Sequence, residues 1–580
     1  MKVSHRLTEK NESELSTSQS GTLRKGRSRS RLAALTLFVV LGTAFVLYCA
    51  MITPHRFGDY GDDGVYVSAA KALATGQGYT IINLPQEKAQ TLVPPFYPFL
   101  LSLIWRAYPQ FPENVTWMMM LSAVATLSFL ALTYRYLVAH GYATQWQALI
   151  VVALAGINWR TMLHGTSVMS EMVYAALAVA ALYMAERYEK EEKGTIGAGI
   201  AVGVVIGLAF LTRSSGIALL IASAFYFVIR GQWKRVLVPA AVASLFVLSW
   251  MSWSYFNPST AEGVNAVYYS NYFRSYSTVY GYLEAMNDAS KIATILNVLG
   301  TNVLLLIIGS IPLSCLGLRY DLPQSLLVSL VLITIILIAA GFIRQARRRI
   351  RLLHIYLSVY LGIYLVSPGT AYDRYIVPIV PFLIMLLVTE LAIPVSRLRR
   401  ELMPDKHLLA RLSAAVIALA LSVAVGIVIY SNGSAIHESL KSLNKVARHT
   451  SERTEAFEWI KANTDRSDIL VCNSDAIYYL YTGRKAVLSF QVTMLDTLPY
   501  RSKPPESSEI TEELFKTIDQ NSGRYLISNA SDFADISDLY QKRISEFITQ
   551  HPEKFVLAFE SSSKNSLIYR IEHDSNRVGQ

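Results

Sequence analysis

Charged residues are scarce in this sequence. Only 16% of its 580 residues are Asp, Glu, Lys or Arg, whereas 52% are hydrophobic. Soluble domains carry about 25% charged residues, so the composition excludes an ordinary soluble protein and favours a membrane protein. Long apolar runs recur along most of the chain, which predicts one large helical bundle rather than a series of soluble domains.

Cysteine is also rare. Cys49, Cys315 and Cys472 form no CxxC pair, which argues against a disulfide scaffold and a cysteine-based zinc site. The net charge is +11, but much of the excess basic charge lies in short clusters beside apolar runs, which is typical of topology signals. No basic patch interleaved with aromatic residues occurs in a polar segment, so we do not expect nucleic-acid binding.

The amino-terminal region predicts the orientation of the chain. Residues 1–30 are polar and rich in Ser, Lys and Arg, so we expect them to be disordered and cytoplasmic. The run 31–53 is too long for a signal-peptide core, which predicts an uncleaved first transmembrane helix. The following segment, 54–113, is then an outer loop. Its apolar spacing predicts short helices at 65–73 and 94–106, both too short to span and expected on the membrane surface.

Further apolar runs predict the remaining spans. One run, 295–318, is an exception. The arginine cluster at 344–351 should be cytoplasmic, but two full crossings after the outer loop 257–294 would leave it outside. We therefore expect 295–318 not to cross completely. The predicted fold is mainly α, a polytopic helical membrane bundle of about eleven spans over residues 31–430. Its other spans are at 115–138, 147–163, 168–185, 195–212, 215–230, 236–256, 325–343, 352–367, 375–395 and 408–430.

Residues 431–580 differ from the rest of the chain. They are polar and mixed in charge, with alternating helical and strand-like segments, which predicts a small extramembrane α/β domain on the outer face. No GxGxxG, Walker or HExxH motif occurs in it. The expected helices are 455–462, 511–519 and 536–549, and the expected strands are 468–472, 524–527, 555–559 and 566–571.

Three acids, Asp59, Asp62 and Asp63, follow directly after the first predicted span. Charged side chains at membrane depth are unfavourable by several kcal/mol, so acids clustered at the membrane surface usually have a function. Two interpretations remain open. The acids form a solvated turn that ends the helix, or Asp62 or Asp63 is a catalytic base at the membrane surface.

Other charged residues are expected at the same outer face. Glu171 begins a predicted span, where it either caps the helix or takes part in a site. Arg374, beside Tyr375, begins another span, where its charge opposes the helix dipole. It either binds an anion or pairs with Asp373. Arg213 lies in an outer turn and either adds a second positive charge or closes a hairpin. Carboxylates that take a proton and arginines that bind phosphate are a chemically sensible set.

Four stretches, taken in order, resemble those of the GT-C glycosyltransferases. This superfamily includes the protein O-mannosyltransferases and the bacterial aminoarabinose transferases. The resemblance covers about residues 30–430. The stretches are Asp62–Tyr66 with its continuation to Tyr79, Pro94–Pro98, Met169–Glu171 and Arg374–Pro381.

This resemblance implies transfer of a sugar from a polyprenyl-phosphate donor to an acceptor lipid, glycan or protein, with inversion at the anomeric carbon. Asp62 matches the general base. Asp63 matches a second acid that is commonly Glu, and Glu171 matches an acid that orients the acceptor or assists a metal. Arg374 matches a position suited to the donor phosphate.

Two further residues and a cofactor belong to the same expectation. Tyr375 and, more weakly, Arg213 are assigned to donor-phosphate binding. Some GT-C enzymes use a divalent metal and others do not. If Mg²⁺ or Mn²⁺ binds, Asp62 and Glu171 are its expected ligands, although the sequence shows no dedicated ligand cluster.

The predicted location is a bacterial inner membrane, with the amino terminus cytoplasmic and the carboxyl-terminal domain periplasmic. Two other functions remain open. A transporter or lipid flippase would place charges or broken helices near the membrane midplane, whereas this sequence places charges at helix ends. A non-catalytic scaffold of the cell envelope would show much the same sequence pattern.

Overall fold

The structure is a computed structural model. The predictions for residues 1–30 lie outside the described residues, as does nearly all of the predicted outer loop 257–294. The structure describes residues 31–191, 195–257, 269, 291–319, 321–367, 373–401, 408–489, 507–529 and 537–572.

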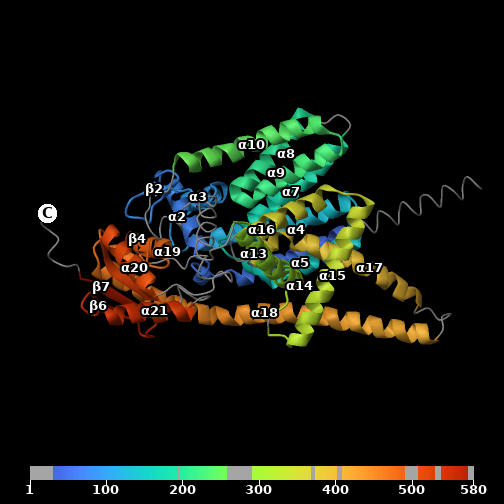
Figure 1. The fold of residues 1–580 in the computed structure, drawn as a ribbon. Coiled ribbons are helices and arrows are strands. Elements are labelled where there is room, and N and C mark those ends of the chain that lie inside the picture. Colours follow the sequence, from blue (N-terminus) through green and yellow to red (C-terminus); the bar gives the residue numbers. More distant parts are fainter. Residues whose placement is uncertain are drawn as a thin grey trace, which may run out of the picture.

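A bundle of helices forms the larger part of the molecule (Figure 1). The bundle helices are Arg31–Met51, α4 (Val115–Ala139), α5 (Gln145–Ile157), α6 (Trp159–Gly165), α7 (Glu171–Lys190), α8 (Ile196–Thr212), α9 (Ile217–Ile229), α10 (Trp233–Phe256), α13 (Lys291–Asn302), the π-helical η3 (Val303–Ser310), α14 (Ile311–Leu316), α15 (Gln324–Arg348), α16 (Leu352–Val366), α17 (Val380–Glu401) and α18 (Leu408–Asn463).

The apolar character of these helices fits a membrane. Within the described ranges, seven helices are long and apolar enough to cross a bilayer, or eight if the bent pair α5 and α6 is one span. Peripheral helices expose large apolar side chains, such as Phe38 at 75% and Val416 at 67% exposure. Lipid chains can cover such a surface without any loss of hydrogen bonds. The predicted polytopic helical bundle is therefore confirmed.

The predicted span 147–163 is a bent pair of helices. The axes of α5 and α6 differ by 64° at Asn158, whose backbone is extended. The Asn158 side-chain oxygen accepts hydrogen bonds from the amides of Arg160 and Thr161, as an N-cap residue does. The local hydrogen bonds of Asn158 thus start a second helix and direct it away from the first.

The two ends of the bundle differ. We call the end that carries the C-terminal domain the outer side; it lies on the left in Figure 1. At the opposite end, Arg351 donates to the carbonyl of His140 and Arg230 to that of Ile350, both at 2.7 Å. Arg235 donates to the backbone carbonyl of Glu189, in the last turn of α7, and to that of Glu191, directly after the helix. The turns predicted to be cytoplasmic therefore gather at one end.

The segment from α13 to α14, which contains the run 295–318, returns to the outer side. It is long and apolar enough to span. Yet Asn302 donates to the carbonyl of Ser367 just after α16 (2.7 Å), and Leu316 accepts from Asn432 of α18 (2.8 Å). Arg319, three residues after Leu316, lines the same pocket as Asp373, which lies in the turn before α17. Asn302 and Leu316 are thus both on the outer side, as expected for a run that does not cross completely.

The outer loop 54–113 forms a compact layer over the bundle. Its two predicted helices exist, but α2 does not lie on the membrane surface, because nine of its 13 residues are buried between α3, the bundle and the C-terminal domain. That expectation is corrected. The elements of the loop are η1 (Pro54–Arg56), α2 (Asp62–Ala74), β1 (Thr80–Ile81), β2 (Lys88–Ala89) and α3 (Phe96–Ala107).

The C-terminal domain is a small α/β domain. Its described strands form one sheet of order β4-β3-β5-β7-β6, in which β3 is parallel to β4 and β5 and the remaining pairs are antiparallel. The predicted helices and strands are all present. The structure adds α19 and β4, which are too short to show a periodic pattern in the sequence. The elements are β3 (Ile469–Cys472), α19 (Asp475–Thr482), β4 (Ala486–Leu488), α20 (Ser507–Asn521), β5 (Gly523–Asn529), α21 (Ser537–Gln550), β6 (Phe555–Glu560) and β7 (Ser566–Ile571).

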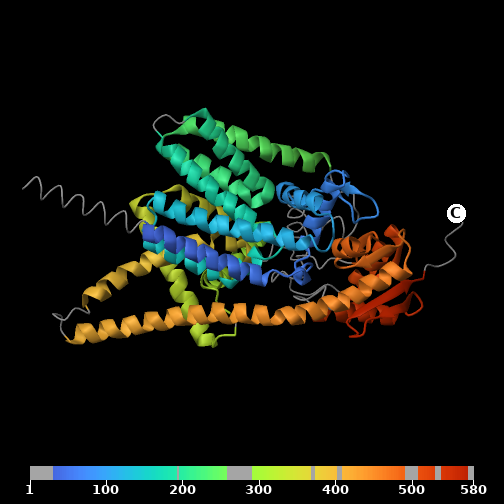
Figure 2. The same cartoon turned by 180° about the vertical axis from the view of Figure 1, so that it is seen from behind.

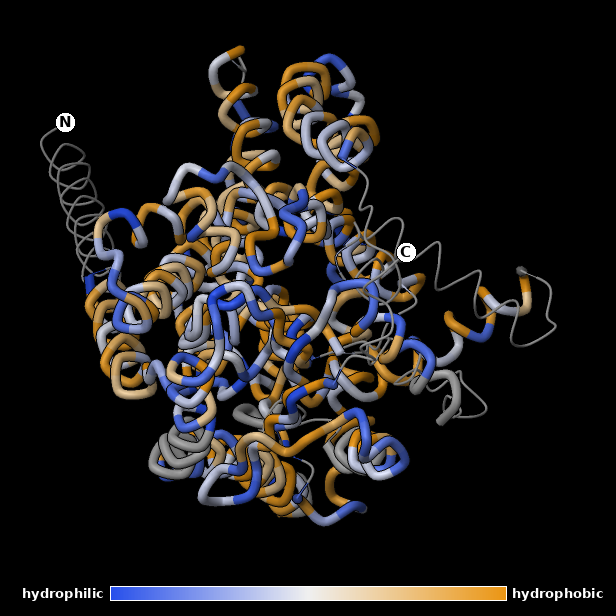
Figure 3. Tube along the Cα trace, turned by 90° about the vertical axis from the view of Figure 1, so that its left-hand side faces the viewer, coloured by the Kyte–Doolittle hydropathy of each residue, from blue (hydrophilic) through white to orange (hydrophobic). Residues whose placement is uncertain are grey.

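Helix α18 joins the bundle and this domain without a break (Figure 2). It passes through residue 430, where the sequence places the domain boundary. Helix α19 then packs on α2, and a Cβ at Gly64 would lie only 2.7 Å from the Ile477 Cδ1 atom. In the view from the outer side, many of the loops that face the viewer contain hydrophilic residues (Figure 3).

One buried carboxyl group connects three outer segments. Asp475 of α19 accepts hydrogen bonds from the Tyr269 hydroxyl (2.6 Å) and the Asn83 side-chain amide (2.9 Å). The Asn83 carbonyl also accepts from the Ala486 amide at 2.8 Å. Burial raises the pKa of Asp475 to about 7. Burial likewise raises the pKa of Asp63 in α2 to about 7.

These two carboxyls predict a pH-dependent stability. Between about pH 4 and pH 7 the native groups hold protons that the unfolded chain has lost, so stability falls as pH rises through this window and is level above it. We expect the thermal midpoint of the purified protein in detergent to be higher at pH 5 than at pH 8. Asp475→Asn should remove about half of this difference. An Asp468→Asn control, at a carboxylate of the same domain that pairs with the exposed Arg524, should keep the full difference. An unchanged slope in Asp475→Asn would contradict the assignment.

Candidate active site

The first acid of the site, Asp62, begins α2. It follows Gly61, whose φ of +69° lets the chain turn into the helix. The Asp62 Oδ2 atom lies 2.8 Å from the Arg374 Nη1 atom, although the two residues are 312 positions apart. Both side chains are partly exposed, at 28% and 21%. The structure thus brings together the predicted base and the predicted phosphate-binding arginine.

Arg374 lies in the short turn η4 (Asp373–Tyr375), before η5 (Val377–Ile379) and α17. The sequence left open whether Arg374 pairs with its neighbour Asp373. Instead, Asp373 pairs with Arg160 of α6 at 2.7 Å, a residue that the bend at Asn158 brings to the outer side. Arg374 is therefore directed at Asp62.

A second pair joins Glu171 and Arg213. Glu171 begins α7 and is fully buried, and its Oε1 atom accepts a hydrogen bond from Arg213 at 2.7 Å. Arg213 also donates to the Ser170 hydroxyl, which bonds to the Tyr66 hydroxyl at 2.9 Å. Within the part of the chain that the structure describes, the other Glu171 oxygen has no hydrogen-bond partner. Glu171 therefore does more than cap a helix.

Tyr375 lies between the two arginines. The guanidinium of Arg213 is 5.8 Å and that of Arg374 is 5.3 Å from the centre of its ring, within the range of cation–π contacts. The ring stacks on Tyr364 of α16 at 4.5 Å. The two ion pairs and Tyr375 thus form one continuous group at the outer ends of α7, α8 and α16.

This group opens on a pocket of about 120 Å³, which we call the arginine pocket. Arg213 supplies its charge, and the turn η2 (Ser214–Gly216) leads directly into α9. The amino end of a helix carries unpaired amides and a partial positive charge, so this position favours an anion. The pocket is lined by Tyr66, Pro94, Thr212, Arg213, Ser214, Ser215, Ile363, Tyr364 and Tyr375.

Asp63 and Asp59 lie apart from this group. The buried Asp63 carboxyl accepts hydrogen bonds from the backbone amides of Gly58 and Gly64, at 2.6 and 2.9 Å, so it fixes the loop before α2. Asp59 is 44% exposed and pairs with Arg56 at 3.8 Å, which agrees with a solvated loop residue.

The predicted metal ligands do not fit a metal in this arrangement. Asp62 and Glu171 are each bonded to an arginine, and no group of three or more His, Cys, Asp or Glu side chains that could hold a metal ion occurs among the described residues. We derive no step through a metal.

Sequence reasoning missed several residues of the site. The sequence pattern assigns no role to Tyr66 or Ser170, although both lie in stretches that carry the family resemblance. His164 is buried next to the group, with its ring 5.6 Å from that of Tyr60. A hydroxyl or imidazole gives no signal in a hydropathy pattern, so only the fold reveals these neighbours.

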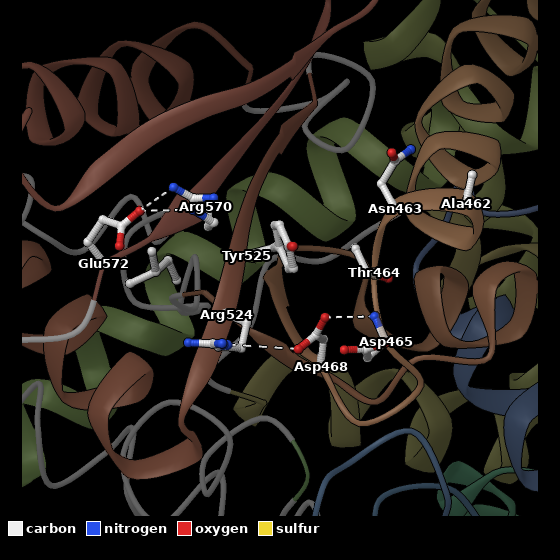
Figure 4. Close-up of a pocket in the computed structure, with 10 residues that line it drawn as sticks. Ala462, Asn463, Thr464, Asp465, Asp468, Arg524, Tyr525, Arg570 and Glu572 are labelled. Carbon is white, nitrogen blue, oxygen red and sulfur yellow. Dashed lines mark hydrogen bonds and ion pairs between the residues drawn. The ribbon is translucent and has the colours of Figure 1, made fainter. Parts of the chain in front are cut away.

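A larger pocket of about 550 Å³ lies on the C-terminal domain, away from this site (Figure 4). Four of its charged side chains form two pairs: Arg524 with Asp468 at 3.8 Å, and Arg570 with Glu572 at 2.7 Å. These arginines are more than half exposed, which makes the ion pairs weak.

No protein-family model matches the chain, and no curated protein matches its sequence. Solved structures share its fold. The oligosaccharyltransferase of Archaeoglobus fulgidus tethered to an acceptor peptide gives a TM-score of 0.53 at 14% identity, over 93% of this chain and 74% of that one. ArnT from Cupriavidus metallidurans bound to undecaprenyl phosphate gives a TM-score of 0.51 at 13% identity, over 93% and 97%.

Another structure of the A. fulgidus enzyme, a complex with Zn and sulfate, gives a TM-score of 0.52 at 15% identity, over 85% of this chain and 68% of that one. These proteins are GT-C glycosyltransferases. At such low identities the likeness shows the fold, so the chain has the GT-C fold that its sequence resemblance predicted.

The Glu171–Arg213 pair predicts a large effect on stability. Glu171→Gln leaves the Arg213 charge, whose side chain is 13% exposed, without its counter-charge. Breaking a buried pair costs about 3–5 kcal/mol, so the thermal midpoint should fall by several degrees. Glu191→Gln is the control, because Glu191 follows the same helix and pairs with the exposed Arg187. Equal midpoints for the two variants would show that the buried pair contributes nothing.

Proposed function

We propose that this protein is a glycosyltransferase that moves a sugar from a polyprenyl-phosphate donor to an acceptor, with inversion, at the outer face of a bacterial inner membrane. The main support for this proposal is that two arginine–carboxylate pairs lie side by side around Tyr375. One of the two arginines, Arg213, lines a pocket at the amino end of α9. The fold supports this proposal, since the ArnT structure of the same fold contains undecaprenyl phosphate.

The arginine pocket suits the donor phosphate. Arg213, the hydroxyls of Ser214 and Ser215 and the helix end supply hydrogen-bond donors and positive charge. The apolar side chain of Ile363, on the membrane helix α16, lines the same pocket. A lipid phosphate combines an anion with an apolar tail, so it matches both parts of this lining.

Asp62 suits the role of general base. Its ion pair with Arg374 holds the carboxylate in place before the donor arrives. A donor phosphate attracts Arg374 as well, which weakens the pair and leaves the carboxylate oxygen open to the acceptor. Asp62 then takes the proton of an acceptor hydroxyl or amine, whose oxygen or nitrogen forms a bond to the anomeric carbon. The bond from that carbon to the phosphate oxygen breaks, and both arginines stabilise the departing phosphate charge.

The geometry changes the roles that the sequence suggested for two acids. Glu171 is bonded to Arg213 and fully buried, so in this proposal it positions the phosphate-binding arginine rather than the acceptor. Asp63 bonds to two backbone amides and positions the start of α2. Both act through other residues, and Asp62 alone of the three acids touches the reacting groups.

Asp62→Asn tests the base directly. The variant should fold and bind undecaprenyl phosphate at least as tightly as the wild type, because Arg374 is no longer shared with a carboxylate. Its transfer rate should fall by about 10²–10⁴, the usual contribution of a general base. The measurement is release of polyprenyl phosphate from candidate donors in the presence of cell-envelope acceptors. Wild-type rates would exclude this role.

Arg374→Ala tests the donor site. Loss of a charge-assisted contact to phosphate should weaken undecaprenyl phosphate binding by roughly tenfold or more, with a small change in thermal midpoint. Arg187→Ala is the matched control, since Arg187 is 62% exposed and lies at the inner end of α7. The affinity is measured by titration of the purified proteins in detergent. Identical affinities for both variants and the wild type would refute donor binding by Arg374.

A further inference from the structure

We propose that a second outer pocket, which we call the α18 pocket, binds a neutral or amino-bearing sugar unit of the acceptor. This inference rests on the proposed function and extends it to the acceptor. The pocket has a volume of about 640 Å³, within the range of small-molecule sites. It is lined by Trp159, Arg160, Arg319, Asp321, Asp373, Ala435, Glu438 and Ser439.

Three consecutive residues connect this pocket to the reacting centre. In the turn η4, Tyr375 lines the arginine pocket, Arg374 is bonded to Asp62, and Asp373 lines the α18 pocket. Consecutive Cα atoms are about 3.8 Å apart, so Arg374, which is bonded to Asp62, has a lining residue of one pocket on either side of it in the chain. A donor in the arginine pocket and an acceptor in the α18 pocket would thus meet at Asp62.

The charge of the α18 pocket excludes a second phosphate site. Two arginines face three carboxylates, Asp321, Asp373 and Glu438, which leaves a net charge of −1. In the arginine pocket, by contrast, Arg213 is the one charged residue of the lining. An anion is therefore favoured in the arginine pocket, whereas a neutral or positively charged group is favoured in the α18 pocket.

The side chains of the α18 pocket suit a sugar. The Trp159 ring contributes apolar surface to the lining, and the Arg160 guanidinium lies over this ring, 4.8 Å from its centre. Around it, the carboxylates accept hydrogen bonds and the guanidiniums donate them, and a ring of hydroxyl groups can do both. Arg319 bonds to both Asp321 and Glu438, at 3.0 and 2.6 Å, so these charged groups are already oriented.

The position of the α18 pocket suits the head group of a membrane acceptor. The pocket lies at the outer end of the bundle, because Asp373 of η4 and Arg160 of α6 line it together with Ala435 of α18. Glu438 is 60% exposed, so the pocket is open to water. The sugar of a lipid or glycan projects at this height above the membrane.

Titration of the full-length protein in detergent tests the inference. The probes are D-glucosamine, D-glucose, inorganic phosphate and undecaprenyl phosphate. We expect the wild type to bind both sugars but not inorganic phosphate in the α18 pocket. Glu438→Gln should weaken glucosamine binding by about threefold to tenfold, as for loss of a charged hydrogen bond, and leave undecaprenyl phosphate binding unchanged. Trp159→Phe should weaken binding of both sugars.

Glu458→Gln is the matched control, because Glu458 lies on the same helix, is 64% exposed and pairs with Lys461 outside the pocket. Two results would overturn the sugar site. One is that neither Glu438→Gln nor Trp159→Phe changes the sugar affinities. The other is that Glu458→Gln lowers these affinities as much as Glu438→Gln does. If undecaprenyl phosphate binds but neither sugar does, the α18 pocket assignment alone fails. If the sugars bind as expected but undecaprenyl phosphate does not, the proposed donor, and not the sugar site, is wrong.

Discussion

The ion pair between Asp62 and Arg374 is the contact on which the candidate site depends. It joins the first outer loop to the turn before α17, across 312 positions of sequence. A charged group at membrane depth is unfavourable unless it is paired, and here Asp62 and Arg374 neutralise each other where their two segments meet. Asp373 bonds to Arg160 and Arg213 to Glu171, so neighbouring charges are directed to different partners and Arg374 remains available to Asp62.

This division of partners separates two chemical environments. Arg213 shares its pocket with hydroxyls, aromatic rings and a helix end, whereas Arg160 and Arg319 share theirs with a larger number of carboxylates. An anionic leaving group and an acceptor that must lose a proton need such opposite surroundings. In the proposed mechanism, a bound phosphate attracts Arg374 away from Asp62. Ion pairing would then account both for the order of the resting site and for its activation by a donor.

Much of this arrangement could be predicted from the sequence, because it follows from where apolar runs begin and end. Long runs predict the spans, and charges at their ends predict that Asp62, Glu171, Arg213 and Arg374 share one face. The pairing among them could not be predicted, since it depends on contacts between distant segments. The bend at Asn158 brings Arg160 to Asp373, and the direction of the Asp63 side chain depends on the turn at Gly58.

The C-terminal domain takes part in positioning Asp62, although hydropathy separates it from the bundle. Its helix α19 packs on α2 so closely that Gly64 leaves no room for a Cβ against Ile477, and Asp475 bonds to Asn83 in the same outer loop. The helix that carries Asp62 is thus buried against the domain as well as against α3. Helix α18 continues from the bundle into this domain and supplies Glu438 to the α18 pocket on the way. A motion of the domain would therefore move Asp62 and one wall of the proposed acceptor site together.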